Sequence, residues 1–146
     1  MLAQNSPTVA EQPRYFPHAA KKPTPPRVLV VDDERLVRWS VAETLTARGY
    51  NVVEAADARS AMQAFGAGHT IDLVLLDLRL PDADDLRVLA CIRHKAPKMP
   101  VMIMTAFATR EIVEEAAVLG ASVVTKPFDL DDLAIAVGCA LAARVY

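Results

Sequence analysis

Four apolar runs of the sequence each lead into residues that could take part in phosphoryl chemistry. In chain order, the residues after the runs VLVV, LVLL, VMIM and VVT are Asp32, Asp33 and Glu34, then Asp77, then Thr105, and finally Lys126. Taken singly these residues have ordinary explanations, because an acid after a strand often caps a helix and a lysine is usually solvated. Taken together they supply an acid pair, a further acid, a hydroxyl and an ammonium group for one site.

Three carboxylates brought into one crevice repel one another, and either a raised pKa or a hard divalent cation relieves the repulsion. Mg2+ takes oxygen ligands and is commonly held by one or two carboxylates together with a phosphate oxygen. Asp77 could therefore attack a phosphoryl donor and form an acyl phosphate. Mg2+ and the Lys126 ammonium would neutralise charge on the equatorial phosphoryl oxygens, and the Thr105 hydroxyl would donate a hydrogen bond to one of them.

The elements that must position these residues follow an alternating pattern. Apolar runs predict five strands, at residues 28–31, 52–54, 73–76, 101–104 and 122–124. The first, third and fourth runs are apolar throughout, as expected for parallel strands that helices cover on both faces. Segments of helical periodicity separate the runs, so the sequence predicts an α/β fold with one open parallel sheet and right-handed crossovers. Ligands of such sheets bind beyond the carboxyl ends of the strands.

The helical segments have recognisable inward stripes and stop signals. The first helix is expected to turn Leu36, Val37, Val41 and Leu45 inward and to end before Gly49, with Trp39 off the stripe as surface cover or a partner contact. Further helices are expected over residues 58–65, 84–95 and 110–119, and after Asp129. Their expected inward residues include Leu86, Leu89, Ile92, Leu133, Val137 and Leu141.

The composition, 146 residues of which 53% are hydrophobic and 23% charged, indicates one folded domain. Residues 27–146 hold 13 basic and 17 acidic side chains, which disfavours direct nucleic-acid binding. Uncharged stretches such as 99–109 and 133–143 have 11 residues, fewer than the roughly 17 needed to span a membrane. The amino end lacks a secretory signal. We therefore expect a cytoplasmic protein that holds Cys91 and Cys139 as buried thiols.

The first 26 residues differ from the rest of the chain. They contain six of the ten prolines, and their apolar residues do not recur at the spacing of a helix or a strand. We therefore expect a disordered, proline-rich tail at 1–26 and a folded domain at 27–146. Tyr15 and Phe16 would be either docking residues or part of a solvated linker.

Residues 27 to about 143 resemble the receiver domain of two-component response regulators. The matching segments are VLVVDDE at 28–34, LVLLDLRLPD at 73–82, MTA at 104–106 and TKPF at 125–128. The resemblance implies a flavodoxin-like (βα)5 doubly wound sheet with strand order 2-1-3-4-5. It also implies that Asp77 accepts phosphate, that Asp32, Asp33, Asp77 and the backbone carbonyl of Arg79 hold Mg2+, and that the Lys126-Pro127 bond is cis.

The same resemblance bears on partners. A sensor histidine kinase or phosphotransfer protein would donate the phosphoryl group, and the chain would act as a signalling switch, catalysing only its own phosphorylation and dephosphorylation. The segments ERLVRWS and DLRLPD look most like receivers of nitrogen-regulation-type activators, which continue into an ATPase and a DNA-binding domain. Since the chain stops at Tyr146, it is either a stand-alone receiver or an excised piece. A possible homodimer, or alternatively a plain solvated surface, would account for the charged residues Arg110, Glu111, Glu114 and Glu115.

Three positions depart from the family pattern. Val123 stands where receivers usually have an aromatic residue, so the readout of phosphorylation would be smaller or differently built. Asp85 replaces a common glycine, with little expected effect. Phe107 and Arg79 occupy positions that in the family govern how water reaches the acyl phosphate. The bulk of Phe107, and the lack of an acid or amide at Arg79, predict slow self-dephosphorylation.

Three other functions can be compared with the receiver interpretation. A phosphatase of the haloacid dehalogenase type needs an acid two residues after its nucleophile, where this chain has Arg79. A flavin-binding module needs a phosphate-cradling loop after the first strand, where Asp32 and Asp33 would repel a phosphate. A phosphorylation-independent interaction module on the receiver scaffold stays open, favoured by Val123 and disfavoured by the intact acidic site.

Overall fold

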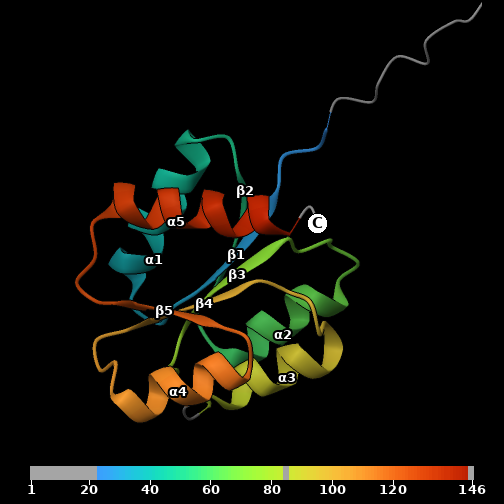
Figure 1. Ribbon diagram of the computed structural model, residues 1–146. Coiled ribbons are helices and arrows are strands. Elements are labelled where there is room, and N and C mark those ends of the chain that lie inside the picture. Colours follow the sequence, from blue (N-terminus) through green and yellow to red (C-terminus); the bar gives the residue numbers. More distant parts are fainter. Residues whose placement is uncertain (1–22, 84–85, 145–146) are drawn as a thin grey trace, which may run out of the picture.

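The computed structural model of the chain describes residues 23–83 and 86–144 (Figure 1). Its strands are β1 (Arg27–Val31), β2 (Asn51–Ala55), β3 (Leu73–Asp77), β4 (Val101–Thr105) and β5 (Ser122–Thr125). Its helices are α1 (Arg35–Ala47), α2 (Ala58–Gly66), α3 (Arg87–Lys95), α4 (Arg110–Val118) and α5 (Leu130–Ala143). Residues 1–22, which include Tyr15 and Phe16, lie outside the described part of the chain, as do Asp84, Asp85 and residues 145–146. Of the tail expected at 1–26, only residues 23–26 are therefore described.

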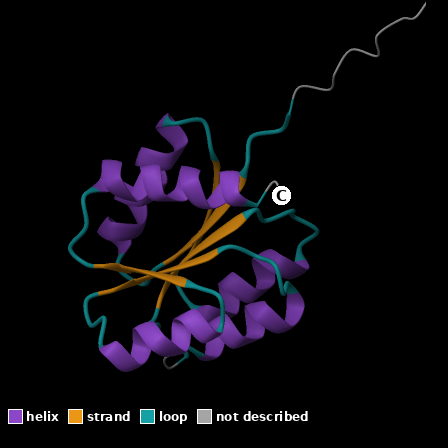
Figure 2. Cartoon of the chain, in the orientation of Figure 1, coloured by secondary structure: helices purple, strands orange, loops and turns teal. Residues whose placement is uncertain are grey.

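The five strands form one parallel sheet in the order β2-β1-β3-β4-β5, which confirms the predicted fold class. Helices α1 and α5 cover one face, and α2, α3 and α4 cover the other (Figures 1 and 2). Alternation along β1 follows this arrangement: Val28 and Val30 pack toward α1 and α5, whereas Leu29 and Val31 pack toward the other three helices. The two-sided cover explains why residues 28–31, 73–76 and 101–104 of the central strands are all apolar.

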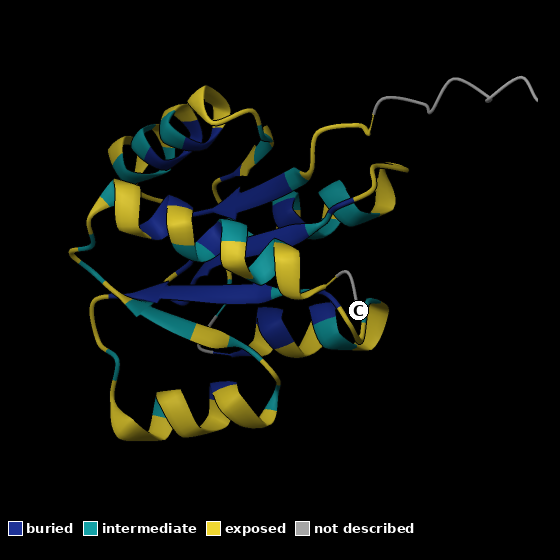
Figure 3. Ribbon diagram, turned by 45° about the horizontal axis from the view of Figure 1, so that its top comes forward, coloured by how far each residue is buried: buried dark blue, intermediate teal, exposed yellow. Residues whose placement is uncertain are grey.

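Burial is concentrated in β1, β3 and β4, while the edge strands β2 and β5 keep exposed residues (Figure 3). The predicted inward residues of α3 and α5 are buried, apart from Leu141, which is half-buried. No helix in the described ranges is both long and apolar enough to cross a membrane. Gly138, inside α5, lies against Tyr50: a Cβ at this position would be 3.3 Å from the Tyr50 hydroxyl.

Two expectations about side chains were wrong. Leu36 is 77% exposed, because Val37, Val41 and Leu45 share one helix face at four-residue spacing and Leu36 is turned about 100° away from it. Cys91 and Cys139 are both exposed free thiols rather than buried ones, since each lies on the outer face of its helix. Trp39, expected off the stripe, is 57% exposed.

Candidate functional site

Residues at the carboxyl ends of four neighbouring strands meet at one edge of the sheet. Asp32 and Asp33 follow β1, Asp77 and Thr105 are the last residues of β3 and β4, and Lys126 follows β5. Parallel pairing in register brings these ends together. They surround a cleft of about 240 Å³ whose lining residues are Asp33, Glu34, Asp77, Arg79, Thr105, Ala106, Phe107 and Lys126. The expected convergence of these strand ends is therefore confirmed.

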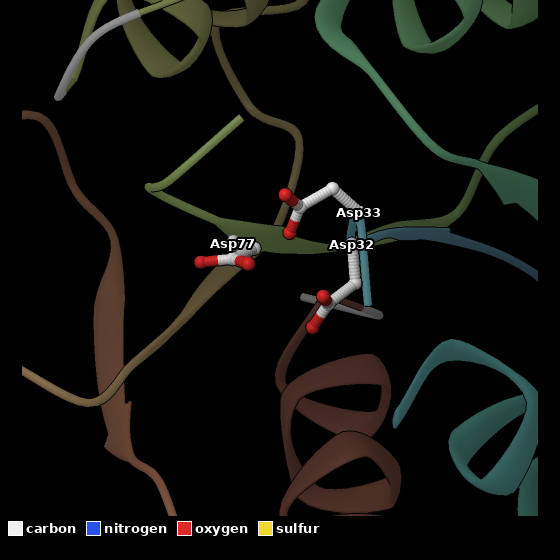
Figure 4. A group of neighbouring side chains, drawn as sticks. All are labelled: Asp32, Asp33 and Asp77. Atoms are coloured by element: carbon white, nitrogen blue, oxygen red, sulfur yellow. The ribbon is translucent and has the colours of Figure 1, made fainter. Parts of the chain in front are cut away.

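Three carboxylates lie together at this edge of the sheet, and two of them, Asp33 and Asp77, line the cleft. Asp32, Asp33 and Asp77 each offer a carboxylate oxygen within 4.8 Å of the others, with Asp32 and Asp33 at the end of β1 and Asp77 at the end of β3 (Figure 4). Asp32 is fully buried and Asp77 nearly so, whereas Asp33 is exposed. Carboxylate oxygens at this spacing are the donors that Mg2+ takes in proteins. The donor set therefore fits this metal.

Lys126 lies among the acids. Its Nζ donates to Asp32 Oδ2 at 2.7 Å and to Asp77 Oδ2 at 3.3 Å, and Glu34 Oε1 is 3.7 Å away. Burial alone would lower the pKa of Lys126, but the hydrogen bond and charge of Asp32, helped by Asp77, raise it above its usual value. Lys126 is consequently a fixed cation. Its peptide bond to Pro127 is cis, as expected.

The proposed phosphoacceptor has an unfavourable environment for a carboxylate. Burial raises the pKa of Asp77, and the neighbouring Asp32 charge adds to the rise. The N–H of Arg79, which donates to Asp77 Oδ1 at 3.1 Å, and the Lys126 ammonium oppose it. A cationic ligand would therefore be drawn to this side chain.

Thr105 and the residues after β4 form one wall of the cleft. Thr105 is buried, and its Oγ1 accepts a hydrogen bond from the Phe107 N–H at 3.1 Å. The Arg79 guanidinium lies over the Phe107 ring, 3.9 Å from its centroid. Both residues were expected to govern how water reaches Asp77, but their contact with each other was not predicted. Val123 is half-buried in β5, packed against the helices of the α2, α3 and α4 face.

The contacts of two polar residues, Arg38 and Asp82, were not predicted. Arg38 of α1 donates to the Asp32 carbonyl oxygen, and Asp82 accepts from the N–H groups of Ala58 and Arg59 at the start of α2. Both residues lie inside segments quoted above, ERLVRWS and DLRLPD. The partners of Asp82 are 24 and 23 residues away, and Arg38 reaches back over the turn between β1 and α1 to a carbonyl six residues earlier. No local pattern could have identified these contacts.

A larger groove of about 650 Å³ opens at the amino edge of the sheet, between residues 24–27 and the end of α5. Of its three charged lining residues, Arg27, Asp72 and Arg144, the last two are paired with each other at 2.7 Å. Among the described residues, this groove brings together no set of reactive side chains comparable to the acidic cleft.

Comparisons with known proteins agree with this geometry. Residues 28–138 match the family model described as the response regulator receiver domain. The chain is 39% identical over 116 residues to the regulatory protein AtoC of Escherichia coli (79% of this chain, 25% of AtoC). It is 34% identical over 106 residues to the DNA-binding transcriptional regulator NtrC of the same species (72% of this chain, 22% of NtrC). The chain thus spans about a quarter of the length of these curated relatives.

A solved structure gives the same result. The receiver domain of NtrX from Brucella abortus is 34% identical, with a TM-score of 0.73, over 79% of this chain and 98% of that one. The matches to NtrC and NtrX confirm the expected resemblance to receivers of nitrogen-regulation-type activators. The chain belongs to the receiver domain family of two-component response regulators.

Proposed function

We propose that the chain accepts a phosphoryl group on Asp77 from the phosphohistidine of a sensor histidine kinase or phosphotransfer protein. Bound Mg2+ would be held by the carboxylates of Asp32, Asp33 and Asp77 and the backbone carbonyl of Arg79. The observation that supports this most directly is the close approach of Asp77 to two further acids and to Lys126. Such a set suits phosphoryl transfer, in which charge neutralisation and positioning supply most of the rate.

The chemistry requires Asp77 to be ionised and correctly placed. An Asp77 carboxylate oxygen attacks phosphorus, the new P–O bond forms as the P–N bond to the donor imidazole breaks, and the departing imidazole nitrogen takes up a proton. The metal would supply positive charge beside the phosphoryl oxygens. Lys126, already within 3.3 Å of Asp77, would donate to a phosphoryl oxygen, as would the Thr105 hydroxyl.

The proposed output is a change in the interaction surface near α4. The Thr105 hydroxyl is linked to the Phe107 N–H, so turning that hydroxyl toward a phosphoryl group would alter the segment that leads into α4. This helix is held loosely, with Ala116 as its buried residue. A homodimer through the charged outer side of α4, where Arg110 and Glu114 pair at 2.8 Å, is one form that the output could take.

The Arg79–Phe107 stack bears on the lifetime of the phosphorylated state. Both residues line the same cleft as Asp77, and we infer that their contact hinders the approach of water to it. We therefore expect slow self-dephosphorylation, with a half-life longer than seconds.

The test is incubation of the chain with acetyl phosphate and Mg2+, followed by intact mass measurement. One added phosphoryl group is expected on the wild type and none on Asp77→Asn or in EDTA. An adduct that persists in Asp77→Asn would show that another residue is phosphorylated. No adduct with any donor would favour a phosphorylation-independent binding module. Sedimentation with and without beryllofluoride, a phosphoryl mimic, tests the dimer.

The domain division is also part of the proposal. We propose that residues 27–146 form the receiver and that residues 1–26 serve as a leader outside it. Deleting residues 1–22 should leave phosphorylation of Asp77 unchanged.

A further inference from the structure

Arg38, in the first turns of α1, is largely buried beside the acidic cleft, with its side chain 17% exposed. Its Nη1 donates to the Asp32 carbonyl oxygen at 2.7 Å, and its Nε donates to Glu54 Oε1 at 3.3 Å. We propose that Arg38 is a positioning residue for metal binding: it holds the main chain at Asp32 so that carboxylate oxygens of Asp32 and Asp33 stay within 4.8 Å of each other and of Asp77. The inference rests on the proposed function.

The segment between β1 and α1 needs such support. The registered pairing of β1 with its neighbours ends at Val31, so the Asp32 carbonyl lies just beyond the strand ladder. The Asp32 N–H donates to Ala55 O at 3.1 Å, and the Asp32 carboxylate accepts from the Glu34 N–H at 2.9 Å. Asp32 is fully buried, where an unsatisfied carbonyl would be costly. Arg38 supplies the donor, and with it the orientation of this peptide.

The chemistry of arginine explains why one side chain can make both contacts. Its planar guanidinium presents several donors in a fixed fork, so it can donate to the Asp32 carbonyl and to Glu54 on β2 at once. Glu54 is half exposed, and an exposed ion pair adds little stability by itself. The contribution of Glu54 is to hold the Arg38 guanidinium in place. A lysine keeps the charge but lacks the fork.

The position of Arg38 allows a second explanation, which predicts the opposite result. A cation beside three carboxylates lowers the local negative potential, so by charge alone Arg38 would weaken Mg2+ binding. Removing it would then tighten binding. A positioning role predicts weaker binding after removal, even when the charge is kept.

Isothermal titration of metal-free protein with MgCl2 separates these explanations. The variants are Arg38→Gln and Arg38→Lys, and the matched control is Arg48→Gln, which removes the same charge from the end of α1, where Arg48 pairs with Asp131 at 2.7 Å. We expect both Arg38 variants to bind Mg2+ about tenfold more weakly, the loss of one hydrogen bond from a charged donor, and the Arg48 variant to bind as the wild type does. Urea unfolding in EDTA checks that each variant is folded. If Arg38→Gln fails to fold, Arg38→Lys decides the result.

Two further readouts complete the test. In the Arg38 variants, the Mg2+ concentration that gives half-maximal phosphorylation by acetyl phosphate should rise. The phosphorylation rate at saturating Mg2+ should return to the wild-type value. A loss of folded protein would lower that rate at every Mg2+ concentration. Tighter binding by Arg38→Gln with unchanged binding by Arg38→Lys would overturn the proposal in favour of charge. Equal affinities in all variants would overturn it while leaving the proposed function intact. A wild type that binds no Mg2+ would overturn both.

Discussion

Replacing Lys126 with methionine should destabilise the metal-free protein, and Mg2+ should restore part of the lost stability. Methionine keeps much of the volume of lysine but removes the cation that contacts Asp32 at 2.7 Å and Asp77 at 3.3 Å. The side chains of all three residues are at most 12% exposed, so water cannot replace the lost contacts. The carboxylates would be left close together without their protein counter-ion.

The size of the effect follows from this burial. Removing one partner of a buried ion pair costs about 3–5 kcal/mol, against a total stability of about 5–15 kcal/mol for a typical domain. Bound Mg2+ supplies the missing positive charge. At a concentration about 100-fold above its dissociation constant, Mg2+ would stabilise the wild type by roughly 2.7 kcal/mol. The variant should bind Mg2+ more tightly than the wild type because it lacks the competing cation, and each tenfold gain in affinity would narrow the deficit by about 1.4 kcal/mol.

The assay is urea unfolding of wild type and Lys126→Met across pH 4 to 8, in EDTA and in Mg2+. The pKa of Lys126 is raised in the fold, so Lys126 stays charged over this whole range, and its own titration would remove its contribution only above about pH 10.4. At pH 7 the variant thus shows the full deficit. Toward pH 4 the deficit should narrow, because Asp77, whose pKa burial raises, takes up a proton and the repulsion falls.

The matched control is Lys98→Met, since Lys98 is an exposed lysine and its loss should change stability by less than about 0.5 kcal/mol. A Lys126→Met variant within about 1 kcal/mol of the wild type in EDTA at pH 7 would refute the reasoning. So would a deficit that Mg2+ leaves unchanged. Either result would mean that the acids do not depend on this cation to lie together.

Three further outcomes are expected. Asp77→Asn should be more stable than the wild type at pH 7 in EDTA. The pKa of Asp77 is raised in the fold, so the wild type loses stability as rising pH ionises this acid. Thermal unfolding should show the gain in stability at pH 7 and not at pH 3. The phosphorylated Phe107→Ala variant should lose its phosphoryl group about two- to fivefold faster than the wild type. This is the rate change expected if one exposed cation–π contact must open before water can enter. The decay of the phosphorylated protein over time measures it. Leu76→Ala, at a fully buried position in β3, should cost about 2–5 kcal/mol in urea unfolding.

The fold and the centre of the site could be predicted because both depend on patterns that the sequence displays directly. Runs such as LVLL are apolar on both sides of the strand, which fits a covered parallel sheet and little else. Once the strands are parallel, the residues that follow them must share one edge. Asp32 and Asp77 are therefore brought together by topology, although 44 residues lie between them.

The contacts that tune the site could not be predicted in this way. Arg38 and Glu54 are 16 residues apart on a helix and an edge strand, and Arg79 meets Phe107 across two loops. Such pairs form only once the helices and strands have packed together, because the side chains reach across from one element to another. The periodicity of the sequence within each element does not indicate these contacts. The exposure of Leu36 was not predicted for a related reason. The apolar face of a helix is broad, so an apolar residue next to an inward-facing position in the sequence is predicted to belong to that face as well.

The electrostatics of the cleft places function and stability in opposition. The acids that would hold a metal and accept a phosphoryl group are buried, and burial raises the pKa of Asp77. Neutralising that acid should therefore stabilise the metal-free fold and abolish phosphorylation, whereas removing Lys126 should destabilise the fold. The two effects should not add in the double variant, because Lys126→Met costs less once Asp77 no longer carries a charge. A double-mutant cycle that gave simple additivity would show that these groups, 3.3 Å apart, do not act on each other.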